Sequence, residues 1–279
     1  MTATAPWAAQ RPSLRRVAVT RSVAYGDGPR RSLDVFRPGG TAAAPVVVFF
    51  YGGRWQGGRK ETYGFVGRAL ARRGIVAVIC DYRVYPEVVY PGFIEDGAEA
   101  IRWTAANIGG HGGDPRRIFV MGHSAGAHIA AMLTLDGRWL DAAGCPGTIA
   151  GLIGLSGPYD FLPIRDPALV RAFGGANRPE TQPIQHVRPR PPRALLITGT
   201  ADRLVDPANS TRLATRLEEA GGAVRLVRYR HVGHAPTVLA LALPAPLRWL
   251  LPVTDEVTAF VNGTARPMPA GVRATAETA

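Results

Sequence analysis

Continuous apolar runs recur along the chain and predict buried β-strands. The first run, residues 45–50, reads Pro-Val-Val-Val-Phe-Phe, which is too apolar for a strand with one face in water, so we expect a central strand covered on both faces. Further strands are expected at residues 75–80, 117–121, 149–155, 194–198 and 224–229. Residues 14–37 alternate polar and apolar positions about the turn Tyr25-Gly-Asp-Gly28, which is typical of a β-hairpin.

Segments between these strands have the spacing of helices. Helices are expected near residues 61–73, 92–108, 127–135, 209–220, 237–243 and 253–261. Strands that alternate with helices imply a mostly parallel sheet with helices on both faces. We therefore assign residues 1–262 to a single α/β domain.

One gap between strands is too long for a simple loop. The strands at 149–155 and 194–198 are separated by the 38 proline-rich residues 156–193. Gaps of this length within a sheet are usually functional, so residues 157–193 or thereabouts are expected to form a small cap over the site. Residues 263–279 are expected to be a disordered tail.

Composition narrows the possible partners. The chain carries a formal net charge of +12, but Lys60 is its only lysine, and the arginines are scattered without a recognition motif. Nucleic acid is therefore not expected as a partner. We expect the positive charge to affect solubility and to attract anionic substrates instead. The apolar stretch 237–251 contains Pro244, Pro246 and Arg248, so we expect no membrane span there.

The two cysteines predict neither a disulfide nor a metal site. Cys80 ends an apolar run, whereas Cys145 lies in a Gly/Pro loop, and no metal-ligand spacing occurs. Residues 1–10 also lack the pattern of a secretory signal. These features favour a reducing, cytoplasmic location. No metal or cofactor is expected, and the oligomeric state stays open.

The strand at 117–121 leads into Gly122-His-Ser-Ala-Gly126, which opens a helix. A serine at such a strand–turn–helix junction is held with its hydroxyl above the sheet, and the two glycines remove side chains that would clash. The free N–H groups and positive dipole end of the helix favour negative charge on a bound carbonyl oxygen. This context predicts Ser124 as a nucleophile, with the N–H of Ala125 as an oxyanion donor.

A serine nucleophile needs an acid and a histidine, which follow it in that chain order in this arrangement. Asp202 lies just beyond the strand at 194–198, at the carboxyl end where such sheets place their sites. We favour Asp202 over Asp206, whose position before Pro207 suits a helix cap, and over the more distant Asp160.

Two histidines follow the last strand. His234 lies in a loop between Gly233 and a helix, whereas His231 lies where the strand still ends, so we favour His234 as the general base. His123 and His128 are interpreted as packing residues near the pocket.

The loop Tyr51-Gly-Gly-Arg-Trp55 follows the first buried strand, and its glycines allow backbone N–H groups to approach a ligand closely. Trp55, Tyr159 and Phe161 are expected to line an acyl or aryl pocket. Because the cap is short, the pocket is expected to be small and to prefer acyl chains of roughly two to six carbons. The Arg54 side chain is expected to reach solvent, with a substrate carboxylate as the alternative.

Taken together, these motifs resemble an α/β-hydrolase. They are Tyr51-Gly-Gly-Arg-Trp55, Asp81-Tyr-Arg83 with Tyr85-Pro-Glu87, Gly113-Asp-Pro-Arg-Arg-Ile118, Gly122-His-Ser-Ala-Gly126, Gly199-Thr-Ala-Asp202 and Gly233-His234. More narrowly, residues 30–262 resemble bacterial carboxylesterases related to feruloyl esterases, kynurenine formamidases and the hormone-sensitive lipase group.

That resemblance implies an α/β-hydrolase fold and a set of roles. Ser124 would be the nucleophile, Asp202 the acid and His234 the base, with oxyanion N–H groups from Gly53, Arg54 and Ala125. The chain departs from the relatives at Tyr51, where they usually have a structural histidine. Asp81 and Arg83 resemble a structural ion pair of the family.

The sequence therefore predicts a serine hydrolase that acts on small-molecule carboxylic esters through an acyl-enzyme. An arylformamidase or amidase with the same triad is the alternative among enzymes. A non-catalytic ligand-binding protein on a hydrolase fold is the alternative of another class, because fold alone does not decide function.

Overall fold

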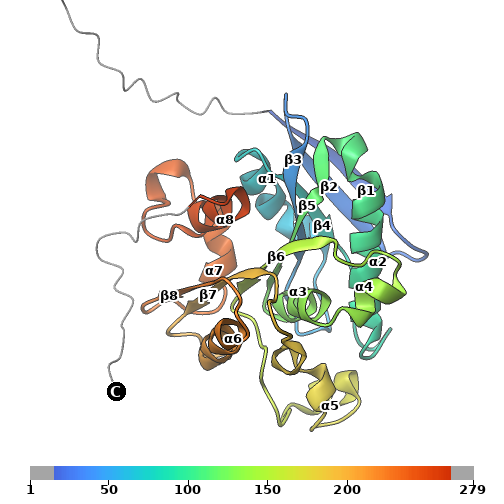
Figure 1. The fold of residues 1–279 in the computed structure, drawn as a ribbon, viewed down its shortest axis with the longest axis vertical. Coiled ribbons are helices and arrows are strands. Elements are labelled where there is room, and N and C mark those ends of the chain that lie inside the picture. The colour runs from blue at the N-terminus through green and yellow to red at the C-terminus, as the bar shows by residue number, and fades with distance from the viewer. Residues whose placement is uncertain (1–15, 265–279) are drawn as a thin grey trace, which may run out of the picture.

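The fold is built on one eight-stranded sheet (Figure 1). A computed structural model describes residues 16–264, so residues 265–279 of the predicted disordered tail lie outside the described residues. The strands are β1 (Val17–Ala24), β2 (Ser32–Pro38), β3 (Ala44–Phe50), β4 (Val76–Cys80), β5 (Gly113–His123), β6 (Ile149–Leu155), β7 (Arg193–Gly199) and β8 (Val224–Tyr229).

The strand order is β1-β2-β4-β3-β5-β6-β7-β8. β1 and β2 pair antiparallel as the predicted hairpin, β2 pairs antiparallel with β4, and all other neighbours are parallel. After β3 the chain passes to β4 on one side and then returns to β5 on the other. Such a reversal leaves a crevice at the carboxyl ends of β3 and β5, which is where open α/β sheets bind ligands.

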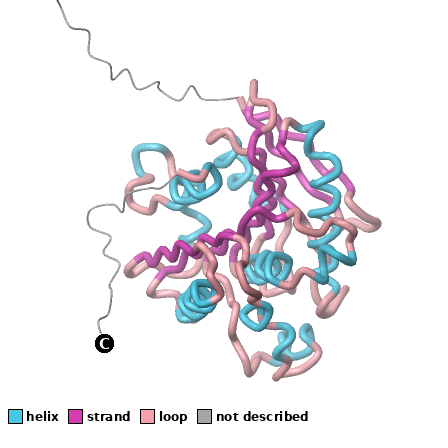
Figure 2. Tube along the Cα trace, in the orientation of Figure 1, coloured by secondary structure: helices cyan, strands magenta, loops and turns pink. Residues whose placement is uncertain are grey.

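Helices cover both faces of the sheet (Figures 1 and 2). They are α1 (Gly64–Ala71), α2 (Gly92–Asn107), α3 (Ala125–Leu135), α4 (Arg138–Ala142), α5 (Pro167–Phe173), α6 (Ala208–Glu219), α7 (Pro236–Leu239) and α8 (Val253–Asn262). α1 contacts α8 on one face, and α2 contacts α3 and α4 on the other. Every residue of β3 is buried, as its unbroken apolar run predicts.

The element bounds differ from the predicted ones where turns interrupt a helix. The helix expected at 61–73 begins as a 3-10 turn, Lys60–Tyr63, before α1. The helix expected at 237–243 divides into α7 and the 3-10 turn Ala240–Ala242, and Pro244 follows shortly after. The short helix α4 was not predicted, because five residues carry too little periodicity.

The insertion between β6 and β7 contains α5 and two 3-10 turns, Pro179–Thr181 and Pro183–His186. The Asp166 carboxylate caps α5 by accepting from the N–H groups of Ala168 and Leu169, at 2.8 and 3.2 Å. Gly174, with φ 71°, ends this helix. In Figure 1 α5 lies apart from the sheet, beyond the loops at one edge of the molecule.

Both cysteines, Cys80 and Cys145, are buried and unpaired. Between residues 16 and 264, no helix is long and apolar enough to cross a membrane. Over the same range, no group of three or more histidine, cysteine, aspartate and glutamate side chains is arranged to hold a metal ion.

Candidate active site

Ser124 stands on a tight turn between β5 and α3. Its backbone has φ 55° and ψ −122°, and its N–H donates to the carbonyl of Leu155 at 2.9 Å. A side chain at Gly122 would overlap the backbone of Gly126, and one at Gly126 would overlap the carbonyl oxygen of Phe50. The two glycines therefore let the strand, the turn and the helix pack closely, and the serine is raised into the pocket at the start of α3.

His234 and Asp202 are joined although 32 residues separate them. The Nδ1 atom of His234 lies 2.7 Å from Oδ2 of Asp202. The other carboxylate oxygen accepts from the N–H groups of Leu204 and Val205, at 2.9 and 3.0 Å. The Asp202 side chain is completely buried and that of His234 is 11% exposed, so the carboxylate is fixed and the imidazole reaches the pocket.

The other candidate acids have different partners. Asp206 accepts from the N–H of Ala208 at 2.9 Å and so caps the start of α6. Asp160 pairs with Arg212, with Oδ2 2.6 Å from Nε. Neither forms a hydrogen bond with a histidine within residues 16–264.

The other candidate histidines are also placed apart from Asp202. The N–H of His231 donates to the Thr200 hydroxyl at 3.0 Å, in an exposed turn. His123 lines the pocket, and its Nε2 lies 3.3 Å from the carbonyl oxygen of His234. Burial, with the neighbouring His234 ring, lowers the pKa of His123 to about 4, so that ring is neutral near pH 7.

His128 is a buried link to the cap. Its Nε2 lies 2.8 Å from the carbonyl oxygen of Thr181, and its ring meets Trp55 edge to face at 5.1 Å. Burial lowers the pKa of His128 to about 4. His128 therefore supports a pocket wall without lining the pocket.

The loop after β3 presents free backbone donors next to the serine. Gly53, Arg54 and Trp55 all have positive φ, at 148°, 57° and 56°. A side chain at Gly52 would come within 2.9 Å of Ser124 Cβ, which measures how closely this loop approaches. In the described part of the chain, the N–H groups of Gly53 and Arg54 have no acceptor. Such donors are available to a ligand oxygen.

Buried hydrogen bonds of Tyr51, at the start of this loop, hold the loop in place. Its hydroxyl donates to Asp81 Oδ1 at 2.8 Å, and burial raises the pKa of Tyr51 well above its usual value, so the phenol keeps its proton. The N–H of Lys60 donates to the same oxygen at 2.7 Å, and Lys60 Nζ lies 3.4 Å from the second oxygen. Tyr82 donates to the Tyr51 carbonyl at 2.7 Å.

The expected ion pair between Asp81 and Arg83 does not form. Asp81 faces the Lys60 ammonium, which also contacts Glu61 at 2.7 Å. Arg83 instead binds Asp96 of α2 through Nε and Nη2, at 2.9 and 2.7 Å. Both partners, Lys60 and Asp96, come from segments outside the loop after β4 that carries Asp81 and Arg83, and the spacing of the motif alone does not reveal them.

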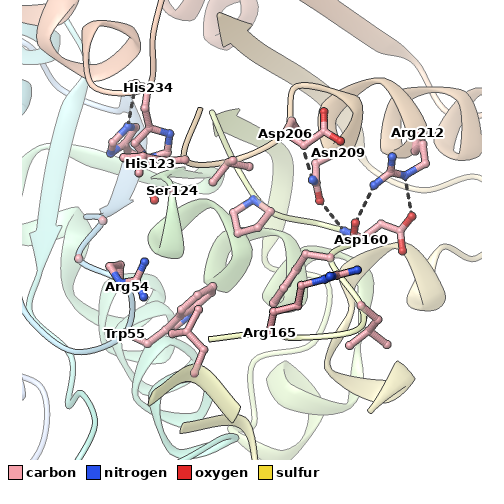
Figure 3. Close-up of a pocket in the computed structure, with 18 of the residues that line it drawn as sticks. Arg54, Trp55, His123, Ser124, Asp160, Arg165, Asp206, Asn209, Arg212 and His234 are labelled. Atoms are coloured by element: carbon pink, nitrogen blue, oxygen red, sulfur yellow. Dashed lines mark hydrogen bonds and ion pairs between the residues drawn. The ribbon is translucent and has the colours of Figure 1, made fainter. Parts of the chain in front are cut away.

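A pocket of about 600 Å³ opens above Ser124 (Figure 3). It is lined by Gly52, Gly53, Arg54, Trp55, Tyr63, His123, Ser124, Pro158, Asp160, Phe161, Leu162, Pro163, Arg165, Leu169, Leu204, Val205, Asp206, Asn209, Arg212 and His234. Pockets of this size hold drug-sized molecules. The expectation of a small pocket is therefore not supported. The pocket is bounded by the loop before α6 as well as by the cap, so the short length of the cap does not set the pocket volume.

Two of the three predicted wall residues line this pocket. Trp55 and Phe161 stack with ring centroids 5.9 Å apart. Tyr159 does not line it: the ring is completely buried and packs against Gly154 and Gly157, which have no side chains to displace it. Tyr63, Arg165 and Arg212 line the pocket without having been predicted, because none lies in a recognisable motif.

The fold and the site define an α/β-hydrolase. The sheet has eight mostly parallel strands, the serine lies at a strand–turn–helix junction, and the acid and the histidine follow it in the chain. Within that class, the chain belongs to the BD-FAE family, whose profile matches residues 33–217. The resemblance to α/β-hydrolases of the carboxylesterase kind is thereby confirmed.

Named relatives agree with this family. A probable isoprenylcysteine alpha-carbonyl methylesterase of Oryza sativa subsp. japonica is 32% identical over 244 residues, which is 79% of this chain and 59% of the relative. Kynurenine formamidase of Salmo salar is 34% identical over 144 residues, 51% of this chain and 47% of that protein. The chain thus spans about half to three fifths of these relatives.

Among solved structures, a truncated carbohydrate esterase from gut microbiota superposes with a TM-score of 0.76. The superposition covers 90% of this chain and 96% of that one, at 20% identity. At this identity, the likeness establishes the α/β-hydrolase fold.

Proposed function

We propose that the protein hydrolyses small carboxylic esters by a Ser124–His234–Asp202 triad through an acyl-enzyme. One observation carries the proposal: the His234–Asp202 hydrogen bond of 2.7 Å lies at the same pocket as the raised Ser124. Esterases among the relatives support the reaction class.

The proposed roles follow from the hydrogen bonds. Asp202 accepts from His234 Nδ1, which leaves Nε2 of the ring free to take the proton of the Ser124 hydroxyl. The serine oxygen then bonds to the ester carbonyl carbon. His234 gives this proton to the alcohol oxygen as the bond between that oxygen and the carbonyl carbon breaks, which leaves the acyl group on Ser124. A water molecule that His234 deprotonates then attacks the same carbon, and the bond to Ser124 breaks, which releases the acid and returns the proton to the serine.

The negative charge on the carbonyl oxygen needs donors at the moment of attack. The N–H groups of Gly53, Arg54 and Ala125 are proposed for this role, since all three lie beside Ser124 at a loop and a helix start. A single preorganised donor of this kind contributes about 3 kcal/mol to transition-state stabilisation in well-studied hydrolases.

Formamide hydrolysis is the second candidate. The likeness to kynurenine formamidase supports it, and Trp55 with Phe161 offers an aromatic wall for an aryl substrate. Both reactions use the same triad, so the choice depends on the leaving group. No metal or cofactor enters either route. Two free buried cysteines are compatible with the reducing, cytoplasmic location that we propose.

A substrate panel tests the proposed function. Hydrolysis would be measured for p-nitrophenyl esters of increasing acyl length, for a feruloyl ester and for N-formylkynurenine, each with the wild type and Ser124→Ala. We expect ester hydrolysis by the wild type, lost almost completely in Ser124→Ala. Turnover of N-formylkynurenine alone would favour the formamidase, and absence of all turnover would favour a binding protein.

A further inference from the structure

Charged side chains gather at the end of the pocket away from Ser124 (Figure 3). Asp160 and Arg212 neutralise each other there, since Arg212 binds the Asp160 carboxylate at 2.6 Å and its carbonyl oxygen at 2.7 Å. Asn209 holds the segment in place by accepting from the N–H of Asp160 at 2.8 Å. This pair leaves no net charge for a ligand.

Arg54 is also occupied. Its guanidinium forms an ion pair with Asp166, which caps α5. As predicted, the Arg54 side chain reaches solvent, with 58% of it exposed, and its ion pair also joins the oxyanion loop to the cap. A substrate carboxylate would have to break this pair to use Arg54.

Arg165 is the contrasting arginine. It lines the pocket and is exposed, and it has no ion-pair or hydrogen-bond partner within residues 16–264. In Figure 3 its side chain lies on the side of Asp160 and Arg212, away from Ser124. Asp206, the remaining acid of the lining, is used as the cap of α6.

We infer that Arg165 is a specificity-determining residue that binds a second, remote carboxylate of an ester substrate. The inference rests on the proposed ester hydrolysis. The apolar walls, Trp55, Phe161 and Leu162, accept the spacer between the ester at Ser124 and the carboxylate at Arg165. A guanidinium suits this task because its planar donors match both carboxylate oxygens. The net charge of +12 attracts the same anions from a distance.

Two matched substrate pairs test the inference, because the carboxylate can lie on either side of the ester. On the acyl side, p-nitrophenyl glutarate is compared with p-nitrophenyl hexanoate. On the alcohol side, p-carboxyphenyl butyrate is compared with p-carbamoylphenyl butyrate. The measured quantity is the ratio of kcat/KM for the anionic ester to that for its neutral counterpart, in wild type, Arg165→Gln and Arg165→Glu.

In at least one pair, we expect the ratio to fall about fivefold to tenfold in Arg165→Gln, mainly through KM, and further in Arg165→Glu. High salt should reduce the ratio in the wild type, as for any partly exposed charge pair. Arg171→Gln is the matched control, since Arg171 is an exposed arginine of α5 that does not line the pocket. Its ratio should equal that of the wild type.

An unchanged ratio in Arg165→Gln for both pairs would overturn the inference. So would a selective loss of anionic turnover in Arg54→Gln, which would return the role to Arg54. Hydrolysis of the neutral esters separates this failure from failure of the proposed function, because it reports the triad without Arg165.

Discussion

At the scale of single residues, the site depends on which of several similar side chains meets which partner. Asp202 and His234 form a pair, whereas Asp206 and His231 are used by a helix cap and an exposed turn. The neighbours in sequence thus provide internal controls for the proposed triad.

Removing the base and removing its neighbour should have very different effects. His234→Ala is expected to lower kcat by about a hundredfold to ten-thousandfold, because the general base is lost, while His231→Ala stays near wild type. Asp202→Asn should likewise cost far more than Asp206→Asn. The check is kcat for p-nitrophenyl butyrate; equal losses within either pair would contradict the assignment.

The buried histidines predict how stability varies with pH. The pKa of His128 is lowered to about 4 by burial, so the unfolded chain binds a proton more readily than the folded one. The free energy of unfolding should therefore decrease as pH falls from about 6.5 to about 4, by roughly 3 kcal/mol for this group. His123 contributes in the same direction.

Urea unfolding at several pH values measures this dependence. In His128→Gln about half of the decrease should disappear, because His123 still titrates. A decrease of full size in His128→Gln would show that other groups cause it.

At the scale of elements, the loop after β3 depends on Tyr51. Tyr51→Phe leaves the buried Asp81 carboxylate with one donor fewer, which should reduce the free energy of unfolding by about 1–3 kcal/mol. Tyr85→Phe is the matched control, because its hydroxyl accepts from the exposed Arg171 side chain and should matter by less than about 0.5 kcal/mol. Thermal unfolding compares them, and equal values would remove the proposed anchoring role.

The Arg54–Asp166 ion pair links two other elements, the oxyanion loop and α5. Asp166→Asn keeps a good helix cap but removes the charge, so stability should change little. The side chains are 58% and 40% exposed, and the loss in kcat should be at most about fivefold.

Salt dependence distinguishes this link from a purely structural effect. The kcat of the wild type should fall toward that of Asp166→Asn as the salt concentration rises. High salt should not lower the kcat of Asp166→Asn further, because the substitution has already removed the ion pair that salt screens. Asp141→Asn, on the exposed side of α4, serves as control. Unaltered salt dependence in Asp166→Asn would count against the link.

At the scale of the whole molecule, periodicity was a good guide to the sheet. The run at residues 45–50 predicted the fully buried β3, because a strand covered on both faces has no polar positions. The order of Ser124, Asp202 and His234 also predicted which side chains to examine, since parallel strands bring their carboxyl ends to one edge. Short elements such as α4 could not be predicted, because they contain too few residues to show a period.

Contacts between distant segments could not be predicted in this way. Two such contacts are the ion pairs of Lys60 with Asp81 and of Arg54 with Asp166. A third is the packing of the Tyr159 ring against Gly154 of β6, where the absence of a side chain leaves space. Each depends on how loops fold in three dimensions, which no local pattern records. The size of the pocket could not be predicted for the same reason.

The most direct test of the proposed mechanism is to identify the residue that a fluorophosphonate probe modifies, by peptide mass spectrometry. We predict a single adduct on Ser124 in the wild type, much slower labelling in His234→Ala, and none in Ser124→Ala. Ser156→Ala should be labelled like the wild type, since Ser156 also has positive φ at the end of a strand but bonds to Thr237 outside the pocket. An adduct on another residue, or labelling that persists in Ser124→Ala, would contradict the account.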